Sequence, residues 1–79
     1  MSKEEMLKNI GCENIQYYML INNDGVKFFK NNIKYDLRHV INCYGVDCDY
    51  YTLNALTEGI NLFIVFNNFE KAYNYIKEL

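Results

Sequence analysis

Apolar residues recur with a helical period at both ends of the chain. Near the N-terminus, Ser2 and Glu5 have the spacing of a capping box and Gly11 is a typical stop, which predicts a helix over residues 3–10. Near the C-terminus, the apolar stripe consists of Phe69, Ala72, Tyr73, Ile76 and Leu79. Polar and charged residues fill the opposite side of this stripe, so we expect an amphipathic final helix that begins after a capping pair, Asn67 and Glu70.

Between these ends, several short runs are rich in aromatic and β-branched residues. Residues 15–21 and 26–30 are predicted as two strands joined by a tight turn at Asp24-Gly25, since such turns need positive φ angles that Gly adopts freely. Asn31-Asn32 predicts a second turn, which leads into a short strand over residues 33–35. Residues 60–66 carry apolar side chains on both sides, which is typical of a central strand covered on both faces.

The middle of the chain changes its period. Leu37, Val40, Ile41 and Tyr44 are spaced as i, i+3, i+4 and i+7, which predicts a helix from Asp36 that ends at Gly45. A loop over residues 45–48 then precedes a second helical stretch, 49–57, for which an extended conformation remains the alternative. These elements together predict an α+β fold: a small, mostly antiparallel sheet of about three strands with helices packed against it.

Length and composition set the limits of this fold. We treat residues 1–79 as a single domain, and a chain this short has a small core. With 51% hydrophobic and 16% aromatic residues, the sequence is not that of a disordered protein. Asn, Lys, Ile, Tyr and Phe account for half of the residues, and all are encoded by A/T-rich codons. That usage indicates a low-GC genome, such as that of a low-GC bacterium or its phages.

Charge and cysteine content narrow the functional classes. The formal net charge of −2 argues against direct nucleic-acid binding, for which a basic stripe is typical. The lysines are scattered, and only Lys27, Lys30 and Lys34 form a loose group. No apolar run is long enough for a membrane span and the N-terminal residues lack the apolar core of a signal peptide. Together with an odd number of cysteines, 3, this favours a cytoplasmic protein without disulfides.

Few residues have the chemistry of an active site. Asp36, His39 and Cys43 would share one stripe of the predicted middle helix, and a Cys activated by a His is a known nucleophile. The ordinary interpretation is an acidic first turn, an exposed His and a half-buried Cys. His39, Cys43 and Cys48 also suggest a metal site, with Cys12 as a remote ligand, but the paired knuckles of zinc sites are missing. No glycine-rich phosphate loop occurs. We therefore expect no enzymatic activity, no cofactor and no metal.

The most informative segment is the run of eight residues from Tyr44 to Tyr51. It combines tyrosines with carboxylates, and tyrosine is enriched in binding hot spots because its large rigid ring has a polar tip. The predicted partner-binding residues are Tyr44, Asp47, Asp49, Tyr50 and Tyr51. Acidic groups beside aromatic rings suit a partner with a basic surface. The alternative is that the aspartates cap turns while the tyrosines fill a thin core.

These features support a small non-catalytic protein that binds and occludes a macromolecular partner. The predicted partner is a protein with a basic surface, for example a nucleic-acid-binding complex. A concrete version is a phage or mobile-element inhibitor of a host defence system, such as an anti-CRISPR protein. A small transcriptional regulator or antitoxin with a helix-turn-helix-like segment over residues 36–59 is the alternative, and a Cys/His enzyme is a second. Self-association into a homodimer also stays open.

Overall fold

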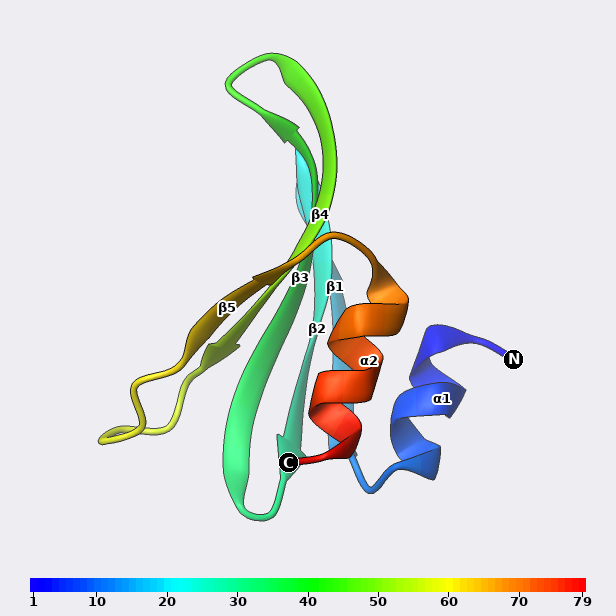
Figure 1. The fold of residues 1–79 in the computed structure, drawn as a ribbon, viewed down its shortest axis with the longest axis vertical. Coiled ribbons are helices and arrows are strands. Elements are labelled where there is room, and N and C mark those ends of the chain that lie inside the picture. Colours follow the sequence, from blue (N-terminus) through cyan, green and yellow to red (C-terminus); the bar gives the residue numbers. More distant parts are fainter.

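The computed structural model describes residues 1–79 as two layers, a five-stranded antiparallel sheet and a pair of helices across one of its faces (Figure 1). The strands follow one another in space in the order of the sequence, so each pairs only with its neighbours along the chain. We call the side without helices the open face. The elements are α1 (Lys3–Asn9), β1 (Glu13–Met19), β2 (Asn23–Lys30), β3 (Ile33–Cys43), β4 (Val46–Ala55), β5 (Phe63–Phe66) and α2 (Phe69–Lys77).

The α+β class, the antiparallel sheet and the C-terminal helix agree with the sequence-based expectation, but the sheet has five strands rather than about three. The difference arises in the middle of the chain. The predicted helix over residues 36–45 is most of β3, and the second predicted helix, 49–57, belongs to β4. The helix-turn-helix-like segment is therefore a β-hairpin, and the predicted loop 45–48 is a tight turn followed by strand.

The helical period of the middle segment is misleading because its apolar residues face different ways. Leu37 lies in the core beneath the helices, whereas Val40 lies on the open face. Ile41 is exposed at an irregularity in the β3–β4 pairing. The true signal in β4 has a period of two, since Tyr51 and Leu53 are buried on the helix side while the residues between them face the other way.

Backbone preferences explain one of the two predicted tight turns. Asn31 and Asn32 adopt positive φ angles of 54° and 66°, which confirms the predicted turn there. The expected turn at Asp24-Gly25 is wrong, because both residues lie inside β2 and the chain reverses over Leu20–Asn22 instead. A glycine is still needed at position 25, because a Cβ atom there would collide with the Tyr18 ring, which crosses it on the open face.

The expected central strand over residues 60–66 lies at an edge. Its ordered part, β5, pairs with β4 on one side and has no strand on the other. Phe63 is 65% exposed and Val65 is 55% exposed, so the strand is not covered on both faces as its sequence predicts.

Both helices agree with the sequence pattern. Ser2 caps α1 by accepting from the backbone N–H of Glu5 at 3.2 Å. Asn68, one residue later than expected, caps α2 through the backbone N–H of Lys71. Four fully buried side chains join the two layers: Leu7 from α1, Phe28 from β2, Leu53 from β4 and Ile76 from α2. Neither helix is long and apolar enough to cross a membrane.

One lysine is part of this core. Lys30, at the end of β2, is only 7% exposed, and its ammonium donates to the backbone carbonyls of Ile76 at 2.6 Å and Lys77 at 3.1 Å. These carbonyls belong to the last turn of α2, where helical amide donors run out, although Ile76 also accepts from the backbone N–H of Leu79 at 3.1 Å. The positive charge therefore satisfies the C-terminal end of the helix and favours its dipole.

Replacement of Lys30 by Met should lower the free energy of unfolding by about 1–3 kcal/mol, because the carbonyls of Ile76 and Lys77 then lose the hydrogen bonds of the buried ammonium. Lys77→Met is the matched control, since Lys77 is exposed on the same helix and should change stability by less than about 0.5 kcal/mol. Urea denaturation followed by circular dichroism measures both. Equal stability of the two variants would remove the structural role assigned to the Lys30 ammonium.

Candidate partner-binding site

The β3–β4 hairpin extends beyond the helices and ends in a two-residue turn (Figure 1). Tyr44 and Gly45 form this turn with φ angles of 53° and 81°, and the Asn42 side chain accepts from the Gly45 N–H. Positive φ is uncommon for a residue other than glycine. The turn places the Tyr44 side chain outside the body of the protein, where it is 99% exposed.

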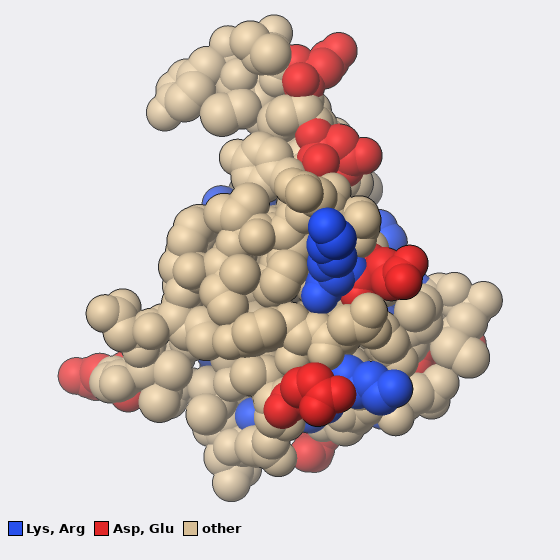
Figure 2. Space-filling view, viewed as in Figure 1, with Lys and Arg blue, Asp and Glu red and all other residues tan.

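Carboxylates follow the turn along β4. Asp47 and Asp49 are both exposed, and Figure 2 shows acidic side chains without Lys or Arg on this part of the hairpin. The sequence explains the sign of the charge, because no Lys or Arg lies between Arg38 and Lys71. The projecting end of the hairpin is therefore both aromatic and acidic.

Apolar side chains surround this end. Val46 and Ile41 are exposed on the hairpin itself, and Ile21, in the neighbouring β1–β2 turn, is 96% exposed. The backbone N–H of Ile41 donates to the carbonyl of Asn22, which fixes the β1–β2 turn beside β3. Contiguous exposed apolar residues with a polar rim are typical of interaction sites. We define the hairpin surface as the exposed residues on both faces of this projecting end and in the turn beside it, namely Ile21, Ile41, Tyr44, Val46, Asp47 and Asp49.

The five residues singled out in the sequence do not form one surface. Tyr44, Asp47 and Asp49 are exposed on the hairpin, whereas Tyr51 is buried on the helix face. Tyr50 lies on the open face, half-buried, where desolvation and the neighbouring Cys43 and Cys48 thiols raise its pKa. Successive side chains of a strand point to opposite faces, which separates Tyr50 from Tyr51. A compact cluster of these tyrosines and aspartates would require a loop, but the segment is a strand.

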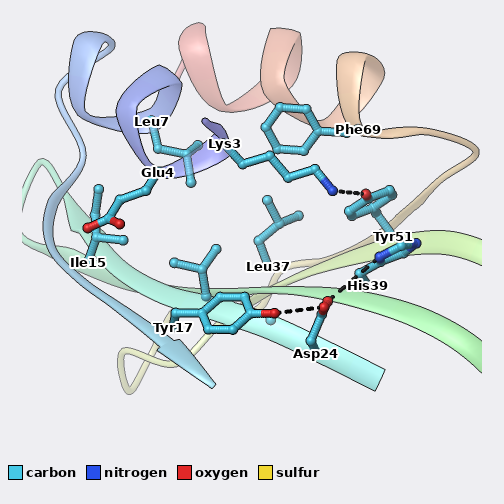
Figure 3. A pocket seen from close by; sticks show the side chains of 12 residues that line it. Lys3, Glu4, Leu7, Ile15, Tyr17, Asp24, Leu37, His39, Tyr51 and Phe69 are labelled. Carbon is cyan, nitrogen blue, oxygen red and sulfur yellow. Dashed lines mark hydrogen bonds and ion pairs between the residues drawn. The ribbon is translucent and has the colours of Figure 1, made fainter. Parts of the chain in front are cut away.

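Asp49 continues into a polar network at the base of the hairpin, on the helix side. Figure 3 shows the other members of this network, Tyr17, Asp24, His39 and Tyr51. Its Oδ1 lies 2.6 Å from His39 Nε2, and the other ring nitrogen, Nδ1, lies 3.6 Å from Asp24 Oδ1. The His39 ring stacks on Tyr51 at a centroid distance of 4.3 Å. Tyr17 donates its hydroxyl proton to Asp24 at 2.9 Å. The network connects β1, β2, β3 and β4 where the hairpin leaves the body.

A groove of about 200 Å³ runs between this network and α1. Its floor is apolar, with Leu7, Ile15 and Leu37 among the lining residues, and Lys3 crosses above it to donate to the Tyr51 hydroxyl at 2.6 Å. The same ammonium lies over the rings of Tyr51 and Phe69 at 5.1 and 5.2 Å from their centroids. An apolar floor with a few charged groups at the rim is suited to holding one side chain of a partner.

The groove is poorly equipped for covalent chemistry, because no Ser, Thr or Cys lines it. The hydrogen bond to Asp24 raises the pKa of the Tyr17 hydroxyl, which is opposite to what a phenolate base requires. Elsewhere, burial raises the pKa of the Cys12 thiol to about 11, which keeps it protonated and unreactive.

The residues of the enzyme and metal hypotheses are placed apart. Asp36 and His39 point to opposite faces of β3, and the Asp36 carboxylate is engaged by Tyr18 and Arg38 on the open face. Cys43 and Cys48 lie near Tyr50 on that open face, away from the His39 ring. No group of three or more His, Cys, Asp or Glu side chains is arranged to hold a metal ion. Asp36, His39 and Cys43 would lie on one stripe only if this segment were a helix. Because it is a strand, they do not share one face.

Sequence reasoning missed the participation of Asp24, Tyr17 and Lys3. These residues come from β2, β1 and α1, which are distant from His39 in the sequence. Asp24 reaches His39 because the two residues are paired across β2 and β3. If residues 36–45 are interpreted as a strand, the sequence does predict part of the network, because His39 and Asp49 then lie on one face of a hairpin. The sequence does not predict the exposure of the single apolar residues Ile21, Ile41 and Val46, because this exposure depends on how far the hairpin projects.

Replacement of Asp24 by Asn should lower the pKa of the Tyr17 hydroxyl toward its ordinary value, because the bond to a carboxylate is what raises it. The bond exists only with a protonated phenol, so it is complete below about pH 10 and is lost as the pH rises through the raised pKa. The ¹³Cζ resonance of Tyr17 followed against pH measures the shift. Asp47→Asn is the control and should leave the titration unchanged; an unaltered Tyr17 pKa in the Asp24 variant contradicts the assignment.

Comparisons with known proteins add no functional information about this arrangement. No protein-family model matches the chain, and neither the curated proteins nor the solved structures gave a significant match. What can be inferred about function therefore depends on the exposure, charge and geometry of the hairpin surface and its supporting network.

Proposed function

We propose that this protein is a non-catalytic binding protein that occludes a protein partner with a basic surface, and that it does so with the hairpin surface. The observation that carries the proposal is the projecting β3–β4 hairpin, whose tip combines a fully exposed tyrosine, exposed aliphatic residues and two carboxylates. Tyr44 contributes to no part of the core, since nothing in the fold covers its 99% exposed side chain. An aromatic residue in that position is most easily understood as an anchor for a partner.

Charge supports the basic character of the partner. Asp47 and Asp49 face solvent on a segment that has no lysine or arginine to neutralise them. Acidic groups around an aromatic anchor attract a basic surface at long range and disfavour an acidic one, so they add association rate and specificity. A partner that normally holds a nucleic acid in a basic channel presents such a surface, and a bound hairpin would compete with that nucleic acid.

The supporting network gives the hairpin surface a defined shape. Asp49 contacts His39 Nε2, and His39 is stacked on the buried Tyr51 ring, so the base of the hairpin is linked to the core. A side chain that is already held in place loses less conformational entropy on binding than a mobile one. The hairpin thus joins a fixed base to an exposed tip, which suits insertion into a groove of the partner.

Inhibition of a host defence system by a phage or mobile element, in the manner of an anti-CRISPR protein, is the concrete version that we propose. It fits the small size, the A/T-rich codon usage and the acidic hairpin. The regulator or antitoxin hypothesis loses its basis, because residues 36–59 contain strands and no recognition helix. We propose no enzymatic function, since the groove has no Ser, Thr or Cys nucleophile and the Asp36–His39–Cys43 set is split between the two faces.

The proposal predicts a partner that is lost when the hairpin surface is altered. The tagged wild-type chain and a Tyr44→Ala/Asp47→Asn/Asp49→Asn variant are used to capture proteins from a lysate of a low-GC bacterial host. A partner identified by mass spectrometry is then purified and titrated. Tyr44→Ala alone should weaken its binding about 30-fold, the effect of about 2 kcal/mol typical of a hot-spot tyrosine. The purified partner should also lose its nucleic acid when the chain is added.

Glu58→Gln/Glu70→Gln is the matched control, because both glutamates are exposed and lie outside the hairpin surface. This variant removes the same amount of charge and should bind as the wild type does. A partner that the hairpin variant retains with full affinity would place the binding site elsewhere. A partner that binds without displacing its nucleic acid would contradict occlusion while leaving binding intact.

A further inference from the structure

The edge strand β5 has the sequence of a strand inside a sheet. Residues 60–66, Ile-Asn-Leu-Phe-Ile-Val-Phe, contain no charge, no proline and apolar side chains directed to both faces. In the fold, however, β5 ends the sheet, and it packs only against β4 and α2 (Figure 1). Natural edge strands are usually protected by charges, prolines or bulges, because their free N–H and C=O groups pair with other strands.

The free backbone groups of this edge can be assigned. The N–H of Ala55 donates to the carbonyl of Leu62, and the register of β4 with β5 continues from this pair. Antiparallel residues alternate between hydrogen-bonded and non-bonded pairs, so Ile64 and Phe66 also bond toward β4. Phe63 and Val65 therefore direct their N–H and C=O groups outward, away from the sheet.

These two residues are also the most exposed side chains of the strand. Phe63 is 65% exposed and Val65 is 55% exposed, and both lie on the open face, opposite Asn54 and Thr52 of β4. The unpaired backbone groups and the unburied apolar surface thus coincide in the same residues. A second strand at this edge would satisfy the backbone and cover the side chains at once.

The other edge of the sheet, β1, is protected in ways that β5 is not, although Tyr17 and Met19 are exposed there. Strand β1 is interrupted by an irregularity between Glu13 and Gln16, where Asn14 adopts a φ of 51°. Glu13 and Gln16 are exposed polar residues. A bulge and a charge are the usual means by which an edge is kept from pairing. Strand β5 has neither a bulge in its pairing with β4 nor a charged residue.

We propose that β5 pairs with β5 of a second copy, antiparallel and around a two-fold axis at Ile64, so that one continuous sheet runs through a homodimer. A second copy fits because no charged residue lies between Glu58 and Glu70, so two copies approach without repulsion. A strand related by a two-fold axis is necessarily antiparallel, and pairing must keep side chains on their own faces. An axis at Ile64 achieves this, since Phe63 then lies opposite Val65 of the second copy and their outward backbone groups bond to each other.

The pairing is favourable for the side chains as well. An aromatic residue beside a β-branched one is among the stabilising cross-strand pairs, and here it occurs twice on the open face by symmetry. The helices of both copies remain on the same side of the joined sheet. The hairpin surface involves β3, β4 and the β1–β2 turn but not β5, so dimer formation is independent of the proposed partner binding.

The test is the molar mass of the full chain in solution. Sedimentation velocity between about 1 and 200 µM should show a reversible shift from 9.4 kDa toward twice that mass, since short strand edges associate with modest affinity. Val65→Lys should remain monomeric throughout, because it places a charge on the pairing edge of each copy. Met19→Lys is the matched control: it introduces the same charge at an exposed position of the opposite edge strand, β1, and should dimerise as the wild type does.

Val65→Pro separates edge pairing from contact through the open face. It removes an N–H that points away from β4, so the monomer keeps its own ladder, yet it should raise the dissociation constant of the dimer at least about tenfold. Circular dichroism verifies that both Val65 variants are folded, and amide exchange of Phe63 and Val65 should slow as the protein concentration rises. A wild-type chain that is monomeric at about 200 µM, or a dimer that persists in folded Val65→Lys, would overturn the proposal and leave the function of the hairpin surface unaffected.

Discussion

The structure depends on the burial of only one face of the sheet. Two short helices cover a single face of the sheet, and they are held by four fully buried side chains, Leu7, Phe28, Leu53 and Ile76. A core this small must gain stability from every contact it makes, which explains why even a lysine, Lys30, is used within it. Everything that the helices do not reach, namely the open face, the distal hairpin and the β5 edge, is left to solvent or to other molecules.

The distribution of charge follows the same division. All of the lysines and the arginine lie in the N-terminal half or on the final helix, so β4, β5 and the tip of the hairpin carry only acidic or uncharged residues. On the open face, Lys27, Lys34 and Arg38 lie over the rings of Phe29 and Tyr18. The two ends of the sheet therefore present different chemistry. The tip of the hairpin is acidic, whereas the β5 edge is uncharged.

The sequence predicts those features of the fold that neighbouring residues determine, and it fails where tertiary packing decides the structure. The Ser2 cap, the apolar stripes of the terminal helices and the Asn31-Asn32 turn depend on neighbouring residues, and the structure confirms them; the cap of the final helix is Asn68 instead of Asn67. The apolar pattern of residues 36–45 fits a helix as well as a strand. Leu37 is buried beneath the helices while Val40 lies on the open face, so only tertiary packing distinguishes the two conformations. The site was found in part: Tyr44, Asp47 and Asp49 are exposed, but the contact of His39 with Asp24 depends on strand register, which the sequence does not reveal.

The order of the strands has a consequence for folding. Every strand pairs with the one before or after it in the chain, so the whole sheet is built from hairpins and short connections. Contacts between residues close in sequence form with little loss of chain entropy, and such topologies reach the native state quickly. Only the docking of α1 and α2 joins distant parts, through Leu7, Lys30 and Ile76. The sheet can thus form from contacts that are local in the sequence, whereas closure of the two chain ends over it depends on contacts between distant residues.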